Sequence, residues 1–402
     1  MSEQKKLRIL QVHNYYQIPG GEDVVAQNER ILLEKNGHTV IEYTRNNSEI
    51  NELHGIKKLK LPFAAVFSVK TYREVKKIIK ENKIDIVHVH NTLMMVSPSV
   101  FYAAFKCKVP VVQTLHNFRM LCPAGSFFRD NQICEACAKG SLMPAIRKKC
   151  YRNSRLQTVV SAAILVIHRL LGTYRKVFFI CLTEFNRKKI LLLNKNGKMI
   201  VDPEKIFVKP NFTFVDKELK NTKESMDYYL FVGRIEALKG IEIAIKAFEK
   251  LPDKKLVVAG TGPMLPDMKK YVQEHHMKNV EFVGYLDKSA LQEKYCHAKA
   301  VVMTSQCYEA FAMAVAEAYS YGVPVIGGNV GNVNNMVDEG VTGIHFEYNS
   351  SKDLADKIMV YETMDIYALK KNAKEFYEKK LRPESNYVLL EEIYTKILDG
   401  SK

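Results

Sequence analysis

Short apolar runs rich in valine and isoleucine alternate with longer amphipathic stretches along the whole chain. Runs of this length are typical of strands that are buried on both faces, and the amphipathic stretches are typical of the helices that cover them. The alternation therefore predicts an α/β protein with parallel sheets between layers of helices. The runs are Leu7–Val12, His38–Tyr43, Ile84–His90, Val109–Leu115, Val177–Leu182, Tyr229–Val232, Lys255–Ala259, Val280–Val283, Ala300–Thr304 and Val323–Ile326.

The length of the chain predicts two domains. Its 402 residues exceed what a single hydrophobic core usually serves. We place the first domain at residues 1–208, the second at residues 209–382, and a terminal helix over residues 383–402 that crosses back to the first domain. The polar segment from Lys209 to Met226 is the expected linker. Each domain is expected to be doubly wound, with ligands at the carboxyl ends of its strands.

Positive charge is concentrated in the first half of the chain. Residues 1–200 contain 33 Lys and Arg against 14 Asp and Glu, whereas the other residues contain 27 against 30. A basic domain favours an anionic partner, which here means nucleic acid, an anionic membrane surface or a phosphorylated substrate. A helix expected from Leu156 to Leu171 follows the basic cluster at residues 147–152. It is either a core helix or a basic, apolar helix that lies on a membrane.

The sequence predicts no membrane-spanning helix and no signal peptide. A spanning helix needs ~20 apolar residues, and no stretch of the sequence reaches that length. The N-terminus from Met1 to Arg8 is polar and lacks the apolar core of a signal peptide. We therefore expect a cytoplasmic protein, and the basic first half favours a peripheral position on the inner face of the cell membrane.

Glycines and cations follow the predicted strands. Gly20 and Gly21 come between the first strand and a helix that begins near Glu22, where backbone amides can approach an anion. A plain tight turn would have the same pattern. In the second half, Arg234 and Lys239 belong to one strand-to-helix loop. Two fixed cations there could hold a diphosphate without a metal.

Two glutamates in the second half are eight residues apart. Glu309 and Glu317 would lie about 80° apart around a helix if one helix carried both. On such a helix, both carboxylates could face one ligand. The backbone amides of Phe311, Ala312 and Met313 would then lie at the helix start, where they could bind phosphate. The alternative is a pair of solvent-exposed glutamates, although apolar neighbours make a solvated face less favourable.

An ordered set of motifs resembles the family 4 retaining glycosyltransferases of GT-B fold. In the second half the matching pieces are Gly233-Arg234, Lys239-Gly240, Gly260-Thr261-Gly262-Pro263, the Glu309 and Glu317 pair, Tyr321-Gly322-Val323-Pro324 and Gly340-Val341-Thr342-Gly343. In the first half they are Gly20-Gly21, His90 and Thr114-Leu115-His116-Asn117. The resemblance covers nearly the whole chain. It implies two Rossmann-like domains that face a central cleft.

The resemblance also implies roles for individual residues. Arg234 and Lys239 would neutralise the diphosphate of a nucleotide diphospho-sugar. Glu317 would hold the ribose, and Glu309 would contact the transferred sugar. His116 would face that sugar from the first domain. The catalytic set is then His116, Arg234, Lys239 and Glu309. The donor-binding set is Gly20, Gly21, Gly233, Gly262, Phe311, Ala312, Met313 and Glu317.

The function implied is that of a retaining hexosyltransferase of cell-surface polysaccharide synthesis. The donor would be a UDP or GDP sugar, and the acceptor a glycan or a lipid-linked diphosphate. The chain has no Asp-x-Asp, so a catalytic metal is not expected. One alternative is a nucleotide-sugar epimerase of GT-B fold. A second is a zinc-containing nucleic-acid-binding protein, although the basic clusters lack the interleaved aromatic residues of such proteins.

Four cysteines lie in a segment that we expect to be an insert, at about residues 120–155. They are Cys122, Cys134, Cys137 and Cys150, with a C-x-x-C in the centre. In a cytosolic chain this pattern favours a tetrahedral structural zinc site, and disulfides or free thiols are the alternatives. The segment resembles an insert in a subgroup of bacterial cell-surface polysaccharide glycosyltransferases. Placed just after His116, it would border the acceptor.

Overall fold

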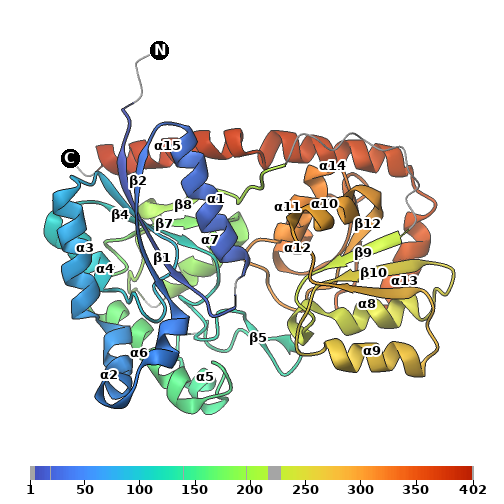
Figure 1. Ribbon diagram of the computed structural model, residues 1–402, viewed down its shortest axis with the longest axis horizontal. Coiled ribbons are helices and arrows are strands. Elements are labelled where there is room, and N and C mark those ends of the chain that lie inside the picture. Colours follow the sequence, from blue (N-terminus) through green and yellow to red (C-terminus); the bar gives the residue numbers. More distant parts are fainter. Residues whose placement is uncertain (1–4, 19, 139, 196, 216–227, 401–402) are drawn as a thin grey trace. The chain divides into compact units, whose positions relative to one another are not determined.

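The computed structural model describes residues 5–18, 20–138, 140–195, 197–215 and 228–400, and the chain divides into two compact units (Figure 1). The N-terminal unit comprises residues 1–126, 135–211 and 386–402, and the C-terminal unit comprises residues 127–134 and 212–385. Residues 127–134, within the expected insert, thus group with the C-terminal unit. Residues 216–226 of the expected linker lie outside the described residues.

The N-terminal unit is built on a six-stranded parallel sheet with the order β2-β1-β3-β4-β7-β8. The strand order reverses beside β1, so the loops after β1 and β3 open at a topological switch point, where ligands of such sheets bind. The strands are β1 (Arg8–Tyr15), β2 (Thr39–Asn46), β3 (Ile86–Val89), β4 (Val111–Leu115), β7 (Phe178–Cys181) and β8 (Ile206–Val208).

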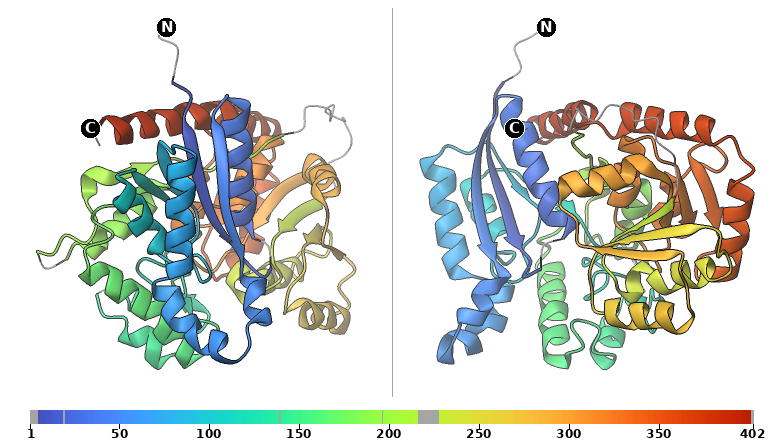
Figure 2. Two further views of the ribbon diagram at one scale, coloured as in Figure 1. Left: turned by 60° about the vertical axis from the view of Figure 1, so that its left-hand side comes forward. Right: turned by 45° about the vertical axis from the view of Figure 1, so that its right-hand side comes forward.

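Successive residues of these strands enter two different cores. Leu10 and Val12 pack toward α3 (Val69–Glu81) and α4 (Ser99–Cys107). Ile9 packs with Leu33 of α1 (Gly21–Lys35) and Leu390 of α15 (Pro383–Asp399). The two-residue period of a strand explains this division. Figure 2 shows α1 and α15 on one side of the sheet and α3 on the other.

Further helices complete the N-terminal unit. Helix α2 (Gly55–Val66) packs against α6 (Arg155–Leu170) through Ala65, Val160 and Ile164. Helix α6 buries one face and exposes the other, so it is a core helix with an exposed apolar side. The remaining elements are η1 (Asn47–Glu52), α5 (Met143–Arg147), α7 (Glu184–Ile190), η2 (Leu191–Leu193) and η3 (Pro203–Lys205).

The C-terminal unit contains a second six-stranded parallel sheet, with the order β11-β10-β9-β12-β13-β14. Its strands are β9 (Tyr228–Val232), β10 (Lys255–Ala259), β11 (Val280–Gly284), β12 (Ala298–Met303), β13 (Val325–Gly328) and β14 (Gly343–Phe346). The order reverses between β9 and β12, which makes this the second switch point. A short antiparallel hairpin, β5 (Phe128–Arg129) with β6 (Gln132–Ile133), belongs to the same unit.

Helices cover both faces of the second sheet (Figure 1). On one face lie α8 (Ile241–Phe248), α9 (Leu265–Glu274) and α13 (Ser351–Tyr361), which share one hydrophobic core with the strands. On the other lie α10 (Lys288–His297), α11 (Met313–Ser320), α12 (Gly331–Met336) and α14 (Ile366–Lys380). Two doubly wound parallel-sheet units are the GT-B architecture, so the predicted fold class is confirmed.

All ten predicted strands are present, each displaced by at most a few residues. The sequence analysis missed β5, β6, β8 and β14, which are two to four residues long. Apolar runs of two to four residues also occur in loops, so they cannot be recognised as strands from the sequence. No helix in the described part of the chain has the length and apolarity needed to cross a membrane.

We predict that Leu390→Ala destabilises the N-terminal unit by about 2–5 kcal/mol, the usual cost of removing a fully buried leucine side chain. Leu390 is completely buried between α15 and the sheet. Val388→Ala on the same helix is the control, because that side chain is 54% exposed. Urea unfolding followed by circular dichroism measures both. Equal midpoints for the two variants would contradict the packing of α15 on this sheet.

Candidate active site

The loop between β9 and α8 carries the two predicted cations. It contains Gly233 and Arg234, then the 3-10 turn η4 (Ala237–Lys239), and ends at Gly240, the residue before α8. The ammonium of Lys239 lies 2.6 Å from Oε1 of Glu309. Burial lowers the pKa of Lys239, but the Glu309 carboxylate more than offsets this, so the net shift is upward. The side chain of Arg234 is half exposed, and its Nε is 3.6 Å from Glu236. The loop thus presents two charged side chains.

Two glycines allow the neighbouring loop to touch this one. Gly260 has a φ of +144°, and a Cβ placed on it would lie 1.9 Å from the carbonyl oxygen of Gly233. A Cβ on Gly262 would lie 2.4 Å from the carbonyl oxygen of Ile235. The loops that follow β9 and β10 are therefore in direct backbone contact. This backbone contact requires glycine at both Gly260 and Gly262, whereas a Cβ on Gly233 would meet no atom closer than 3.8 Å.

Glu309 lies in the loop after β12 and not on a helix. Helix α11 begins only at Met313. The expectation that Glu309 and Glu317 share a helix is therefore wrong. The Asn332 amide donates to the carbonyl oxygens of Glu309 at 2.6 Å and Ala310 at 3.0 Å, which stabilises a non-helical backbone here. A side-chain donor 22 residues away cannot be read from local spacing.

The Glu309 carboxylate is held by two donors. The hydroxyl of Ser305 donates to Oε1 at 2.6 Å, and the Lys239 ammonium lies at the same distance from that oxygen. Only 12% of the Glu309 side chain is exposed. The structure therefore brings Lys239 and Glu309 together, two of the four residues predicted to be catalytic.

Glu317 extends from α11 and is bound by a tyrosine. Its Oε2 accepts a hydrogen bond from the hydroxyl of Tyr295 at 2.8 Å. Burial raises the pKa of this carboxyl group. At the helix start, Phe311 and Ala312 are buried, and the amide of Met313 donates to the carbonyl of Phe311 at 3.0 Å. The Met313 amide, predicted as a phosphate ligand, is thus already occupied.

In the N-terminal unit, His116 follows β4 and stacks on His90. The ring centroids are 5.2 Å apart, and Nε2 of His116 is 3.0 Å from Nδ1 of His90. Burial lowers the pKa of His90 to about 4 and the pKa of His116 well below its usual value, so both rings are neutral near pH 7. A cavity of about 60 Å³ is lined by both histidines, Asn117 and Arg119. It has room for a few water molecules.

Gly20 and Gly21 stand at the start of α1, as predicted. The amide of Gly20 donates to Oδ2 of Asp23 at 2.9 Å, and Oδ1 of Asp23 is 2.7 Å from Nε2 of His13. The φ of Gly20 is −134°, which any residue can adopt. A Cβ added to Gly20 would meet nothing within 4 Å. The chain itself therefore does not require a glycine at this position.

The sequence analysis missed a polar group beside these glycines. The Tyr16 hydroxyl donates to Oε2 of Glu22 at 2.9 Å, and the Asn117 amide lies 3.4 Å from the same oxygen. Burial raises the pKa of Glu22 to about 7, although the nearby charges of His13 and Arg119 oppose the shift. The position of Glu22 directly after Gly20-Gly21 was the signal that could have identified it.

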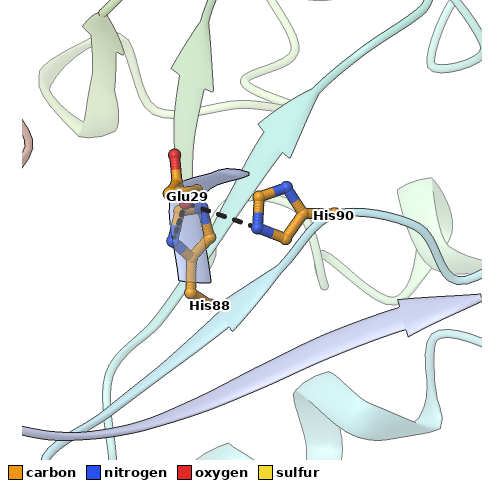
Figure 3. A group of neighbouring side chains, drawn as sticks. All are labelled: Glu29, His88 and His90. Atoms are coloured by element: carbon orange, nitrogen blue, oxygen red, sulfur yellow. Dashed lines mark ion pairs between the residues drawn. The ribbon is translucent and has the colours of Figure 1, made fainter. Parts of the chain in front are cut away.

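A buried charged cluster was also missed. Glu29 of α1 lies 2.9 Å from Nδ1 of His88 and 3.3 Å from Nε2 of His90, as Figure 3 shows. The ammonium of Lys209 lies 3.0 Å from the other oxygen of Glu29. Among the described residues, Glu29, His88 and His90 form the one group with the proximity of metal ligands. Since Lys209 already supplies a positive charge there, we assign no metal to it.

The four insert cysteines are divided between the two units. Cys122, Cys137 and Cys150 belong to the N-terminal unit, whereas Cys134 is grouped with the C-terminal unit. Cys137 and Cys150 lie in or beside a small apolar cluster that includes Leu142. The structural zinc site stays a prediction, and the same holds for its alternatives.

Both halves of the chain match models of glycosyltransferase families. Residues 214–380 match "Glycosyl transferases group 1", and residues 19–177 match "Glycosyltransferase Family 4". Together these matches cover most of both units. The chain belongs to the family 4 glycosyltransferases. The first match spans Arg234, Lys239, Glu309 and Glu317, and the second spans Gly20, Gly21 and His116.

Individual relatives agree with this assignment. An uncharacterised glycosyltransferase of Methanocaldococcus jannaschii is 24% identical over 98% of this chain and 99% of the relative. The crystal structure of a glycosyltransferase from Rickettsia africae superimposes with a TM-score of 0.68 at 18% identity, and covers 98% of this chain and 99% of its own. Anabaena HepE in complex with UDP gives a TM-score of 0.66 at 15% identity, with 97% and 100% covered.

We predict that Gly260→Ala destabilises the C-terminal unit of this glycosyltransferase by roughly 2–6 kcal/mol. The reason is that a steric clash and an unfavourable φ each cost about 1–3 kcal/mol. Gly20→Ala is the matched control, because its backbone suits alanine and the added methyl group meets nothing. Thermal unfolding compares the two. A Gly260→Ala protein as stable as wild type would refute the loop contact.

Proposed function

We propose that this glycosyltransferase transfers a hexosyl group from a nucleotide diphospho-sugar to a glycan or lipid-linked acceptor, with retention at the anomeric carbon. In this proposal the C-terminal unit binds the donor, and the N-terminal unit binds the acceptor. The pathway served is the synthesis of cell-surface polysaccharide. The observation that carries the proposal is the Lys239–Glu309 ion pair at the carboxyl edge of the second sheet.

A leaving diphosphate fits the cations of this loop. As the glycosidic bond breaks, negative charge grows on the phosphate oxygens, and cations already fixed there stabilise the transition state more than the ground state. Arg234 and Lys239 would supply that charge. Before the donor binds, Glu309 neutralises Lys239. A bound diphosphate would compete for the ammonium and leave the Glu309 carboxylate to accept hydrogen bonds from hydroxyls of the transferred sugar.

Glu317 would bind the ribose of the donor. A carboxylate can accept hydrogen bonds from two neighbouring hydroxyls, and a buried one that is not fully hydrogen-bonded gains from such partners. Tyr295 holds one oxygen of Glu317, which fixes the carboxylate in place. Because burial disfavours the ionised form, the approach of hydroxyl donors would also favour ionisation of this group.

The open space at Gly20 supports a substrate role for the first loop of the N-terminal unit. Neither backbone conformation nor packing in the chain explains this glycine. A substrate phosphate close to the backbone would explain it. His116 would meet the transferred sugar, and Glu22 would accept a hydrogen bond from the acceptor. With a pKa of about 7, Glu22 is partly ionised at neutral pH.

Retention would follow from attack on the face that the diphosphate leaves. The bond between C1 and the phosphate oxygen breaks, the bond between C1 and the acceptor oxygen forms, and the acceptor proton passes to the departing phosphate. The residues of this chain would hold both partners and stabilise the phosphate charge. The nucleotide would be of the UDP or GDP type. The solved complex of HepE with UDP supports the uridine option.

An exposed basic and apolar surface would hold the enzyme to the inner face of the cell membrane. We call it the α2–α6 surface. Its apolar members are Ile56, Leu59, Phe63, Leu156, Leu170 and Leu171, each more than 60% exposed. Lys58, Lys60, Arg152 and Arg155 are exposed near them in the chain. Two contributions favour binding to a membrane surface. Apolar side chains enter the lipid, and cationic side chains attract the anionic headgroups. A lipid-linked acceptor would be found there.

We predict that one nucleoside diphosphate among UDP, GDP and ADP binds the protein, and that CMP does not. Glu317→Ala should weaken that binding roughly 10- to 100-fold, because hydrogen bonds to a charged group contribute about 1.5–3 kcal/mol. Isothermal calorimetry makes the measurement. Glu274→Ala is the control, since this exposed carboxylate lies on α9 away from the loops.

Absence of nucleotide binding by the folded wild-type protein would refute the proposed donor site. Incubation with the nucleotide sugar alone distinguishes the alternative enzyme. An epimerase converts the free sugar nucleotide without any acceptor, whereas the transferase requires one. The anomeric configuration of the glycoside, read from proton NMR coupling constants, tests retention.

We predict that the double substitution Leu59→Ser and Phe63→Ser lowers binding to phosphatidylglycerol vesicles at least about tenfold. Each apolar side chain that enters the lipid contributes about 1.5–3 kcal/mol. Vesicle sedimentation measures the bound fraction, and added salt should also lower it. Tyr285→Ser with Tyr367→Ser is the control, because these side chains are equally exposed but belong to the C-terminal unit. Unchanged binding of the α2 variant would exclude this surface.

A further inference from the structure

A continuous series of polar contacts connects Lys209 to His116 inside the N-terminal unit. The Lys209 ammonium is 3.0 Å from Oε2 of Glu29, and Oε1 of Glu29 is 3.3 Å from Nε2 of His90. Nδ1 of His90 is then 3.0 Å from Nε2 of His116. Figure 3 shows the Glu29 side chain directed at His88 and His90. Only His116, at the end of the series, is not fully buried.

The carboxylate of Glu29 is ionised although it is buried. Burial alone would raise the pKa of this group, but the charges of His88 and Lys209 lower it well below its ordinary value. The side chains of Glu29 and Lys209 are each 1% exposed, so water does not screen the pair. Nδ1 of His88, the nitrogen that faces Glu29, also lies 2.7 Å from the hydroxyl of Tyr394 on α15, and Nε2 of His88 lies 2.8 Å from the hydroxyl of Thr114 on β4. A fixed negative charge therefore faces His90.

A neutral His90 has two ways to place its proton. A carboxylate only accepts hydrogen bonds, so Glu29 favours the proton on Nε2 of His90. Nδ1 of His90 then accepts from Nε2 of His116. The competitor is the Gln11 amide nitrogen, which lies 3.0 Å from Nε2 of His90. One of its two hydrogens is donated to the carbonyl of Ala26 at 2.9 Å, and the other can be donated to Nε2 of His90 when that nitrogen carries no proton. If Gln11 donates to His90 instead, the proton moves to Nδ1 and the direction of the whole series reverses.

We propose that Glu29 is a positioning residue that selects, through His90, the ring nitrogen of His116 that carries the proton. With Glu29 ionised, His116 carries its proton on Nε2, and Nδ1 is left as an acceptor for a substrate hydroxyl. With the opposite arrangement, Nδ1 is a donor. Lys209 keeps Glu29 ionised, so it influences His116 indirectly, through Glu29 and His90. The consequence for sugar transfer rests on the proposed role of His116.

Glu29→Gln tests the proposal directly. It keeps the shape of the side chain, but its amide can donate to Nε2 of His90. Nitrogen-15 NMR of the full-length protein labelled at histidine reports the tautomer of each ring, and the spectrum of His116→Asn identifies the His116 signals. We expect Nε2 protonation of His116 in wild type and Nδ1 protonation in Glu29→Gln. We also expect kcat to fall roughly 10- to 100-fold, with little change in the KM of the donor.

A second variant keeps the test valid if Glu29→Gln folds poorly, since Glu29→Gln leaves the Lys209 charge buried without its partner. The double substitution Glu29→Gln with Lys209→Met removes both charges and should show the same reversed tautomer. Glu34→Gln is the control, because Glu34 lies on α1 with an exposed side chain, and it should leave the His116 signals unchanged.

The outcomes separate this proposal from the proposed function. The same His116 tautomer in wild type and in both Glu29 variants would overturn the positioning role of Glu29. A reversed tautomer with unaltered transfer would support the positioning role and overturn the role of His116 in the reaction. A reversed tautomer with a lower kcat supports both.

Discussion

The buried ion pair of Lys209 and Glu29 holds together the parts of the N-terminal unit that are most distant in sequence. Lys209 also contacts Oδ1 of Asn386 at 2.8 Å, and the Asn386 amide donates to the carbonyl of Pro210. The chain leaves the unit after residue 211 and returns at residue 386. Both connections are thus fixed to helix α1 at a single point. Removing one charge from such a pair costs about 3–5 kcal/mol, whereas an apolar replacement of both is often tolerated. The pair therefore argues for specificity of arrangement more than for stability.

The order of the strands in each sheet determines where the side chains of the candidate active site lie. In each unit the order of strands reverses beside the first strand, and three of the predicted catalytic side chains lie in loops that leave the carboxyl ends of central strands. His116 follows β4, and Lys239 and Glu309 follow β9 and β12. Loops at such points can carry polar and charged side chains because the rigid sheet below them supplies the stability. At these positions the C-terminal unit carries a paired cation, Lys239, and the N-terminal unit carries neutral histidines.

The strands and the charged loops could be predicted from the sequence because local patterns encode them. Valine-rich runs predict buried strands. The glycine motif at residues 260–263 predicts a tight loop, and the structure shows that the backbone contact at Gly260 requires a glycine. The contacts that shape the site are not local. Asn332 holds the loop of Glu309 out of a helix, and the hydroxyl of Tyr295 reaches Glu317 from another helix. Glu29 looked like an ordinary position of an amphipathic helix, and only the fold brings it to Lys209. The spacing of residues in the sequence cannot predict a hydrogen-bond or ion-pair partner that comes from a distant part of the chain.

Both units compensate the charges of their key groups, by ion pairs between oppositely charged side chains or by burial that keeps histidine rings neutral. Lys239 is paired with Glu309, Lys209 with Glu29, and the pKa values of His90 and His116 are lowered so that neither ring is charged at neutral pH. In the proposed function, a diphosphate that enters the C-terminal unit would meet a cation whose partner it could displace, and not a bare charge that water has already solvated. If a diphosphate replaces the Glu309 carboxylate beside Lys239, one anion takes the place of another. The charge around Lys239 then changes little, and little free energy is needed to reorganise the surrounding groups. In the N-terminal unit the Lys209–Glu29 pair is closed to solvent, and in our proposal it acts on the substrate only through the position of the proton on the neutral ring of His116.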